Sequence, residues 1–141
     1  NREMAYAGLL MTARDFAKFG VLYRCQGNWQ GQQIVPADYV AASTRADAPH
    51  TQPGQPFVGG HVFGPGYGYQ WWLPGAGNNT FAAIGVYNQF IFVDPNNETV
   101  IVKLSANPAY ATTAEEADNK DNENLAALHA ISEHFASMDW S

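Results

Sequence analysis

The sequence predicts an α+β domain in which helices flank an antiparallel sheet. Three observations support this: amphipathic periodicity toward both ends of the chain, a central region of aromatic and β-branched residues, and short polar links within that region. Helical segments that precede and follow a run of strands are typical of the α+β class. The 141 residues have the size of one domain, and a composition of 46% hydrophobic and 14% charged residues is sufficient for a packed core.

The first helix is predicted at about residues 12–26. Thr12 can cap its amino terminus, with Asp15 three residues later in the reciprocal capping position. Apolar or small residues then recur at helical spacing on one face, at Phe16, Phe19, Gly20 and Tyr23. The pattern therefore predicts an amphipathic helix that packs on the sheet.

A short second helix is predicted from Pro36 to about Ser43, after a turn at residues 28–31. Proline suits the first helical position because its φ is already fixed and no N–H is needed there. Residues 44–66 are rich in proline and glycine and show no periodicity. Such long irregular segments are often functional or mobile.

Four strands are predicted: Tyr67–Leu73, Phe81–Val86, Gln89–Val93 and Thr99–Leu104. Short polar links between the last three favour antiparallel hairpins. In the first strand, Tyr67, Tyr69 and Trp71 would face one side and Trp72 the other. Packing in the sheet core is one interpretation of these aromatic residues. A platform that stacks on a ligand is the alternative.

Residues 105–120 are polar and are predicted to form a loop, and a final helix follows at about 121–138. Asp121 and Glu123 lie in its first turn, where negative charge stabilises a helix. Five apolar residues are predicted to share its buried face: Leu125, Leu128, Ile131, Phe135 and Met138.

The composition excludes several classes of function. A net charge of −6 is unsuited to nucleic acid or an anionic membrane surface, since both require a basic surface. No apolar run approaches the ~20 residues of a membrane-spanning helix, so we expect a soluble chain. The compartment is left open between bacterial periplasm and cytoplasm. Cys25 is the single cysteine, so an internal disulfide is impossible.

The sequence predicts no metal site and no cofactor. His50 and His61 are too far apart for a local ligand pair, and His129 and His134 are five residues apart, which turns a helix by about 500° and places them on different faces. No serine is followed three positions later by lysine, and Gly-x-Ser-x-Gly does not occur. No nucleophile with an activating base can therefore be named.

Several stretches resemble one known group of enzymes in their order and spacing. They are Ala7-Gly-Leu-Leu-Met-Thr-Ala-Arg-Asp-Phe-Ala-Lys-Phe-Gly20, Gly66-Tyr-Gly-Tyr-Gln-Trp-Trp72, Ala83-Ile-Gly-Val-Tyr-Asn-Gln89, Val93-Asp-Pro95 and Val100-Ile-Val-Lys-Leu-Ser105. Together they are similar to the C-terminal part of the serine β-lactamase and penicillin-binding-protein-like hydrolases. The branch of that family that they resemble holds class C β-lactamase-like esterases and amidases, such as 6-aminohexanoate-dimer hydrolase.

The resemblance implies that residues 1–141 are the C-terminal portion of a β-lactamase-like domain, whose antiparallel sheet is flanked by helices. In this family the Ser-x-x-Lys nucleophile motif and a tyrosine motif lie upstream, and neither is in this chain. The chain starts Asn-Arg-Glu-Met, without an initiator Met or a signal peptide, so we expect a cut inside a longer protein. The chain alone is therefore expected to be inactive.

The remaining family element is the sheet edge that carries Lys-Thr-Gly in β-lactamases. By the resemblance this position is Ala83-Ile84-Gly85, and the N–H of Val86 is one of two oxyanion-hole donors. Ala83, Ile84 and Tyr87 are the implied substrate-binding residues. Without a lysine, a β-lactam carboxylate loses a charged partner, whereas a neutral ester or amide loses little.

Two functions remain open at this stage. The first is the C-terminal part of a serine hydrolase that cleaves small-molecule esters or linear amides through an acyl-enzyme. The second is a non-catalytic truncated relative, or a binding module with Trp71 or Trp72 as a stacking platform. In addition, the resemblance places N-terminal strands beside the strand Thr99–Leu104. We therefore expect the isolated chain to self-associate through that edge. Asn88 stands where relatives often have glycine.

Overall fold

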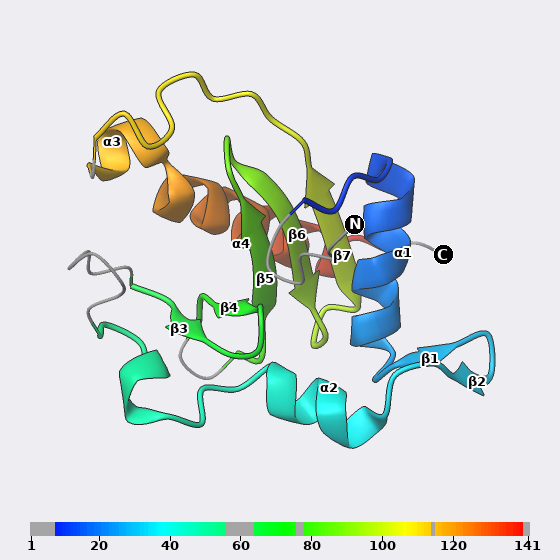
Figure 1. Ribbon diagram of the computed structural model, residues 1–141. Helices are drawn as coiled ribbons and strands as arrows, with labels where there is room; N and C mark the ends of the chain where they lie inside the picture. The colour runs from blue at the N-terminus through cyan, green and yellow to red at the C-terminus, as the bar shows by residue number, and fades with distance from the viewer. Residues whose placement is uncertain (1–7, 56–63, 76–77, 114, 140–141) are drawn as a thin grey trace.

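The computed structural model describes residues 8–55, 64–75, 78–113 and 115–139; His61 and the first residues of the chain lie outside these ranges. The five strands of its main sheet are adjacent in chain order and all antiparallel: β3 (Gly66–Tyr67), β4 (Trp72–Leu73), β5 (Phe81–Gly85), β6 (Gln89–Asp94) and β7 (Thr99–Lys103). Helix α1 (Ala13–Arg24) and helix α4 (Asp121–Ala136) flank the sheet (Figure 1). The predicted α+β class is confirmed.

Smaller elements connect these parts. The turn predicted at residues 28–31 belongs to a hairpin of β1 (Asn28–Trp29) and β2 (Gln32–Gln33), and α2 (Ala37–Ser43) follows with Pro36 as its N-cap. A 3₁₀ turn, η1 (Pro49–Thr51), lies in the irregular segment. A short helix, α3 (Glu116–Asn119), interrupts the predicted loop before α4. Within the described residues, no helix is both long and apolar enough to span a membrane.

Successive side chains along the strands point to opposite faces of the sheet, so a hydrophobic core forms on each face. Toward α1, Phe81, Ile91 and Val93 pack with Tyr23 of the helix. Toward α4, Ala82, Phe90 and Phe92 pack with Leu125 and Leu128. Because β6 contributes to both cores, its residues are buried on both faces, and the sheet is fixed between two helices.

The start of α1 agrees with the predicted cap. The Thr12 hydroxyl accepts a hydrogen bond from the Asp15 N–H at 3.2 Å and donates one to the Asp15 carboxylate at 2.7 Å. Gly20 lets this helix approach the sheet closely, because a methyl group there would lie 2.5 Å from Val100 Cγ1. Gly20 is therefore a packing residue of the interface between α1 and the sheet.

The prediction of one continuous strand at residues 67–73 is wrong. The chain reverses between β3 and β4, which pair as an antiparallel hairpin with Tyr67 opposite Trp72. Gln70 has a φ of +67° in this reversal. Trp71 is 2% exposed and packs against α1, so the core interpretation is correct for that residue. Trp71 therefore lies in the reversal and is buried in the core, whereas Trp72 begins β4 and packs on Tyr67.

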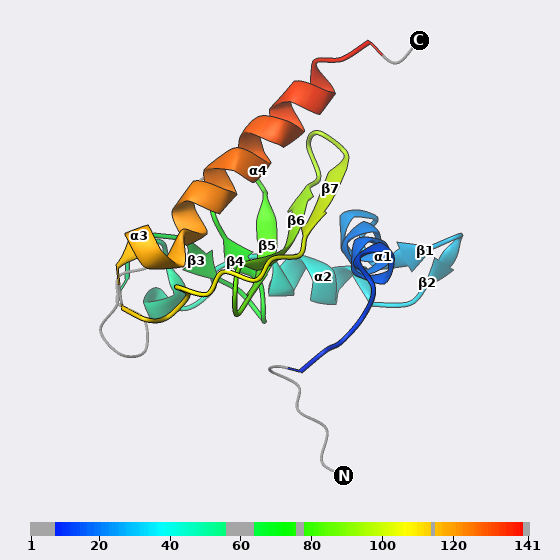
Figure 2. The same cartoon turned by 90° about the horizontal axis from the view of Figure 1, so that it is seen from above.

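The predicted buried face of the last helix is correct only in its first half. Leu125, Leu128 and the unpredicted Ser132 are buried. Ile131, Phe135 and Met138 are 42–43% exposed. Seen from above in Figure 2, the end of α4 extends past the strands. Ile131 precedes Ser132, which is buried and donates to Asp94 at the end of β6, so the exposure of Ile131 follows from the side of the helix on which it lies.

Candidate active site

The free end of β5 is the first feature of the candidate site. On one edge, β6 pairs along β5 as far as Gly85, which lies opposite Gln89. On the other edge, β4 pairs at a single position, Trp72 opposite Ala82. Among the described residues, no strand covers that second edge beyond Ala82. A strand edge left open in this way can hold an extended ligand by main-chain hydrogen bonds.

The turn after β5 presents its first two residues to solvent. Val86 is 60% exposed and Tyr87 is 53% exposed. Within the part of the chain that the structure describes, no group accepts a hydrogen bond from the Val86 N–H. An unpaired main-chain donor at the end of a strand is the type of group that can stabilise a developing oxyanion.

The five residues implied by the resemblance lie together along the end of β5, but their side chains have different surroundings. Ala83 packs partly against the α1-side core, and Ile84 packs partly against the α4-side core. Gly85 ends the strand, and only Val86 and Tyr87 extend prominently into solvent. Ala83 and Ile84 can therefore contribute main-chain groups to the open edge while their side chains stabilise the strand.

Residues after β7 support this turn and were not identified from the sequence. The side-chain amide of Gln89 forms two hydrogen bonds with the main chain of Ser105, accepting one from its N–H at 3.1 Å and donating one to its carbonyl. Tyr110 packs against Tyr87 with ring centroids 6.3 Å apart. Burial, with a smaller contribution from the Asp121 charge, raises the pKa of Tyr110 above its ordinary value. The polar composition of residues 105–120 gave no signal of this role.

Among the described residues we find neither an activated nucleophile nor a metal site. The buried hydroxyls of Ser43 and Ser132 donate to the Val40 carbonyl at 3.0 Å and to the Asp94 carboxylate at 2.8 Å. Both therefore have structural roles. His129 Nε2 lies 3.0 Å from Asn78 Nδ2, and no group of three or more His, Cys, Asp or Glu side chains in the described segments could hold a metal ion.

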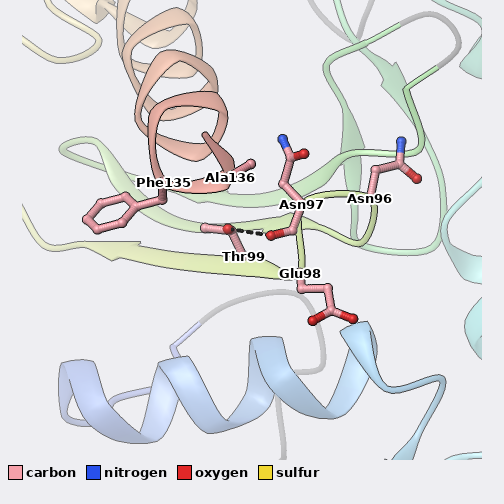
Figure 3. Close-up of a pocket in the computed structure, with 6 residues that line it drawn as sticks. All are labelled: Asn96, Asn97, Glu98, Thr99, Phe135 and Ala136. Carbon is pink, nitrogen blue, oxygen red and sulfur yellow. Dashed lines mark hydrogen bonds between the residues drawn. The ribbon is translucent and has the colours of Figure 1, made fainter. Parts of the chain in front are cut away.

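Two cavities lie away from the end of β5. One, of about 540 Å³, is formed by the β6–β7 turn and the end of α4 (Figure 3). There the Thr99 hydroxyl donates to the Asn97 carbonyl at 2.9 Å. The other, of about 380 Å³, lies between Pro65, Pro74 and the His129 side of α4. Neither is lined by Val86 or Tyr87, so the candidate site is an open strand end.

Comparison with known proteins identifies the family of this chain. Residues 1–126 match the family model described as Beta-lactamase, so the chain belongs to this family of β-lactamase-like hydrolases. It is 30% identical over 104 residues to the 6-aminohexanoate-dimer hydrolase of Paenarthrobacter ureafaciens, an alignment that covers 74% of this chain. The Bacillus anthracis structure named "Putative 6-aminohexanoate-dimer hydrolase" superposes with a TM-score of 0.67 and 28% identity over 90% of the chain.

The chain is much shorter than both relatives. It spans 26% of the Paenarthrobacter protein and 30% of the Bacillus structure. The suspected membership of the β-lactamase-like hydrolases and the fold expected from it are confirmed.

Proposed function

We propose that this chain is the C-terminal portion of a serine hydrolase that cleaves esters or linear amides through an acyl-enzyme. The observation that carries the proposal is the unpaired N–H of the exposed residue Val86 at the open end of β5, in a chain of the β-lactamase family. In the complete protein, a serine upstream of residue 1 supplies the nucleophile. This chain supplies part of the oxyanion hole and one wall of the cleft.

The proposed reaction has two acyl-transfer steps. The upstream serine oxygen attacks the substrate carbonyl, and the carbonyl oxygen becomes negatively charged in the tetrahedral intermediate. The Val86 N–H donates a hydrogen bond to that oxygen, together with the N–H of the serine itself. The upstream Lys/Tyr pair accepts the serine proton during the attack and donates it to the leaving alcohol or amine as the intermediate collapses. Water then attacks the acyl-enzyme and gives a proton to the same pair, and the pair returns this proton to the serine oxygen as the acid is released. The open edge at Ala83–Gly85 holds the substrate, and Tyr87 lies beside it.

The substrate preference is testable in the complete protein. Because Ala83 replaces the lysine of Lys-Thr-Gly, we expect kcat/KM for a p-nitrophenyl ester to exceed that for a chromogenic cephalosporin at least about tenfold, the effect of one lost charge-assisted hydrogen bond. Steady-state kinetics on both substrates and on a linear amide measure this. The isolated chain serves as the background control, since it should hydrolyse none of them. A preference for the cephalosporin would contradict the proposal.

The alternative of a stacking platform has less support. Trp71 is buried against α1, and Trp72 packs on Tyr67 with ring centroids 4.5 Å apart. The nucleotide sequence upstream of the region encoding residue 1 distinguishes the enzyme from a non-catalytic truncated relative. An open reading frame that continues upstream through Ser-x-x-Lys and a tyrosine motif supports the enzyme, and a native start at residue 1 supports the truncated relative.

We also infer that the isolated chain pairs with a second copy through β7. This strand is last in the sheet order, and Lys103 is its single charged residue. Within the described residues no strand lies on its outer edge, and the exposed Ile131 and Phe135 of α4 add apolar surface. Edge strands with so little charge are prone to pair with other chains.

We expect the mass from light scattering to rise with concentration, and the amide hydrogens of β7 to exchange more slowly as it rises. The amides of β6, already paired on both sides, serve as the internal control. A monomer at all concentrations, with exchange in β7 independent of concentration, would exclude this association.

A further inference from the structure

The turn that carries Val86 contains a buried polar residue, Asn88. Its φ is +66°, in the left-handed region, and it is only 2% exposed. Asparagine tolerates this conformation better than most residues, although glycine adopts it without cost. Conformational freedom therefore does not explain a buried asparagine at this position.

Every hydrogen-bonding atom of the Asn88 amide group has a partner. Its Oδ1 accepts from Asn107 Nδ2 at 2.8 Å. Its Nδ2 donates to the Asn119 carbonyl at 2.6 Å and to an Asp121 carboxylate oxygen at 3.0 Å. In addition, its main-chain carbonyl accepts from Lys103 Nζ at 3.3 Å. One residue thus connects the β5–β6 turn to the end of β7, to the loop after it, and to the junction of α3 and α4.

The partner Asn107 is itself fixed. Its Nδ2 also donates to the Asp118 carbonyl at 2.7 Å, and its N–H donates to the Tyr87 carbonyl at 3.4 Å. Hydrogen bonds therefore restrain the two residues that follow Val86 from several directions. A turn with such restraints has few alternative conformations, whereas Val86 itself is exposed.

We propose that Asn88 is a positioning residue that holds the β5–β6 turn so that the Val86 N–H stays directed at the site of the developing oxyanion. This inference rests on the proposed function. An oxyanion donor is effective because it is already oriented before charge develops, and a displacement of about 1 Å can reduce the rate about 100-fold. A glycine at this position could not form the side-chain contacts of Asn88.

The test compares two glycine substitutions in the complete protein. Asn88→Gly keeps the left-handed backbone and removes the buried amide. Asn79→Gly is the matched control, because Asn79 also has a positive φ (+54°) but is exposed in the turn before the other end of β5. We expect Asn88→Gly to lower kcat for a p-nitrophenyl ester about 10- to 100-fold with KM within about twofold, since orientation matters in the transition state. Asn79→Gly should leave both constants within about twofold of wild type.

A second variant keeps the test decisive if Asn88→Gly fails to fold. Asn107→Ala removes the hydrogen-bond donor to Asn88 Oδ1, so we expect it to lower kcat as well. The double variant should lose less than the product of the two single losses, because both substitutions remove the same contact. A kcat within twofold of wild type in folded Asn88→Gly, or independent effects of the two substitutions, overturns the inference. If Asn88→Gly does not fold, a kcat within twofold of wild type in Asn107→Ala overturns it.

Failure of the proposed function gives a different result. If wild-type complete protein hydrolyses no ester or amide and is not labelled by a fluorophosphonate, the proposed function is wrong. The restraint of the turn by Asn88 is then measured by hydrogen exchange at the Asn107 N–H, which donates to the Tyr87 carbonyl. Faster exchange in Asn88→Gly than in wild type or Asn79→Gly supports a fixed turn, and equal exchange in all three proteins overturns it.

Discussion

Replacing Val86 by proline in the complete protein should lower kcat for ester hydrolysis by about 10²- to 10³-fold, the cost of removing one oxyanion-hole donor. Proline removes the main-chain N–H, and Val86 is not among the residues with a positive φ that proline could not adopt. Because the hydrogen bond strengthens as charge develops on the substrate oxygen, kcat and kcat/KM should fall together. Steady-state kinetics on a p-nitrophenyl ester measure the change.

The matched control for this experiment is Val86→Ala. It keeps the N–H and removes only exposed methyl groups, so kcat should remain within about threefold of wild type, as for most exposed substitutions. A folded Val86→Pro protein with the kcat of Val86→Ala would show that this N–H is not an oxyanion donor.

The second large effect is on stability. Asp94 is buried at the β6–β7 turn, and its carboxylate accepts four hydrogen bonds. Two come from the N–H groups of Asn96 at 3.1 Å and Asn97 at 3.2 Å, one from Asn97 Nδ2 at 2.9 Å, and one from Ser132 Oγ at 2.8 Å. The last of these joins the hairpin to α4. Asp94 therefore connects the β6–β7 hairpin to a residue of α4 that lies 38 residues later in the chain.

We expect Asp94→Ala to reduce the free energy of unfolding by about 3 kcal/mol, because a buried hydroxyl and two N–H groups lose their acceptor. Glu98→Gln in the same turn is the control. The Glu98 side chain is exposed, and its 3.9 Å ion pair with Arg24 should contribute less than about 1 kcal/mol. Urea unfolding of the two variants measures the difference. Equal stabilities would exclude a structural role for the Asp94 carboxylate.

Local rules predicted most of the regular structure. The helix cap at Thr12 depends on residues three positions apart, and the hairpins that join β5, β6 and β7 depend on short polar turns. In both cases the residues that determine the conformation are neighbours in the chain. These elements could therefore be located from the sequence without knowledge of the tertiary fold.

The two wrong predictions concern segments whose conformation or burial depends on tertiary contacts. The aromatic run around Trp71 looks like one strand, but the chain reverses there and places Trp71 on α1. Phe135 follows the helical period of the buried Leu128, yet it is 43% exposed at the β6–β7 turn, where it lines an open cavity with Thr99. Periodicity identifies an apolar face of a helix, but it does not reveal how far the neighbouring layer extends.

The candidate site stays a prediction of the resemblance, whose five residues are consecutive in the chain from Ala83 to Tyr87. The structure places them at the end of β5 and in the turn after it. The groups that hold the turn could not be predicted, since Asn107 and Asn119 are distant in sequence and reach Asn88 only through the fold. Neither their polar character nor their spacing distinguishes them from ordinary loop residues.

The most direct test of the central claim is a crystal structure of the complete protein after reaction with a fluorophosphonate. We expect a covalent adduct on an upstream serine, with one phosphonyl oxygen about 2.7–3.1 Å from the Val86 nitrogen, as oxyanion-hole geometry requires. An adduct whose phosphonyl oxygens all lie beyond hydrogen-bond distance of that nitrogen would show that Val86 is not part of the oxyanion hole.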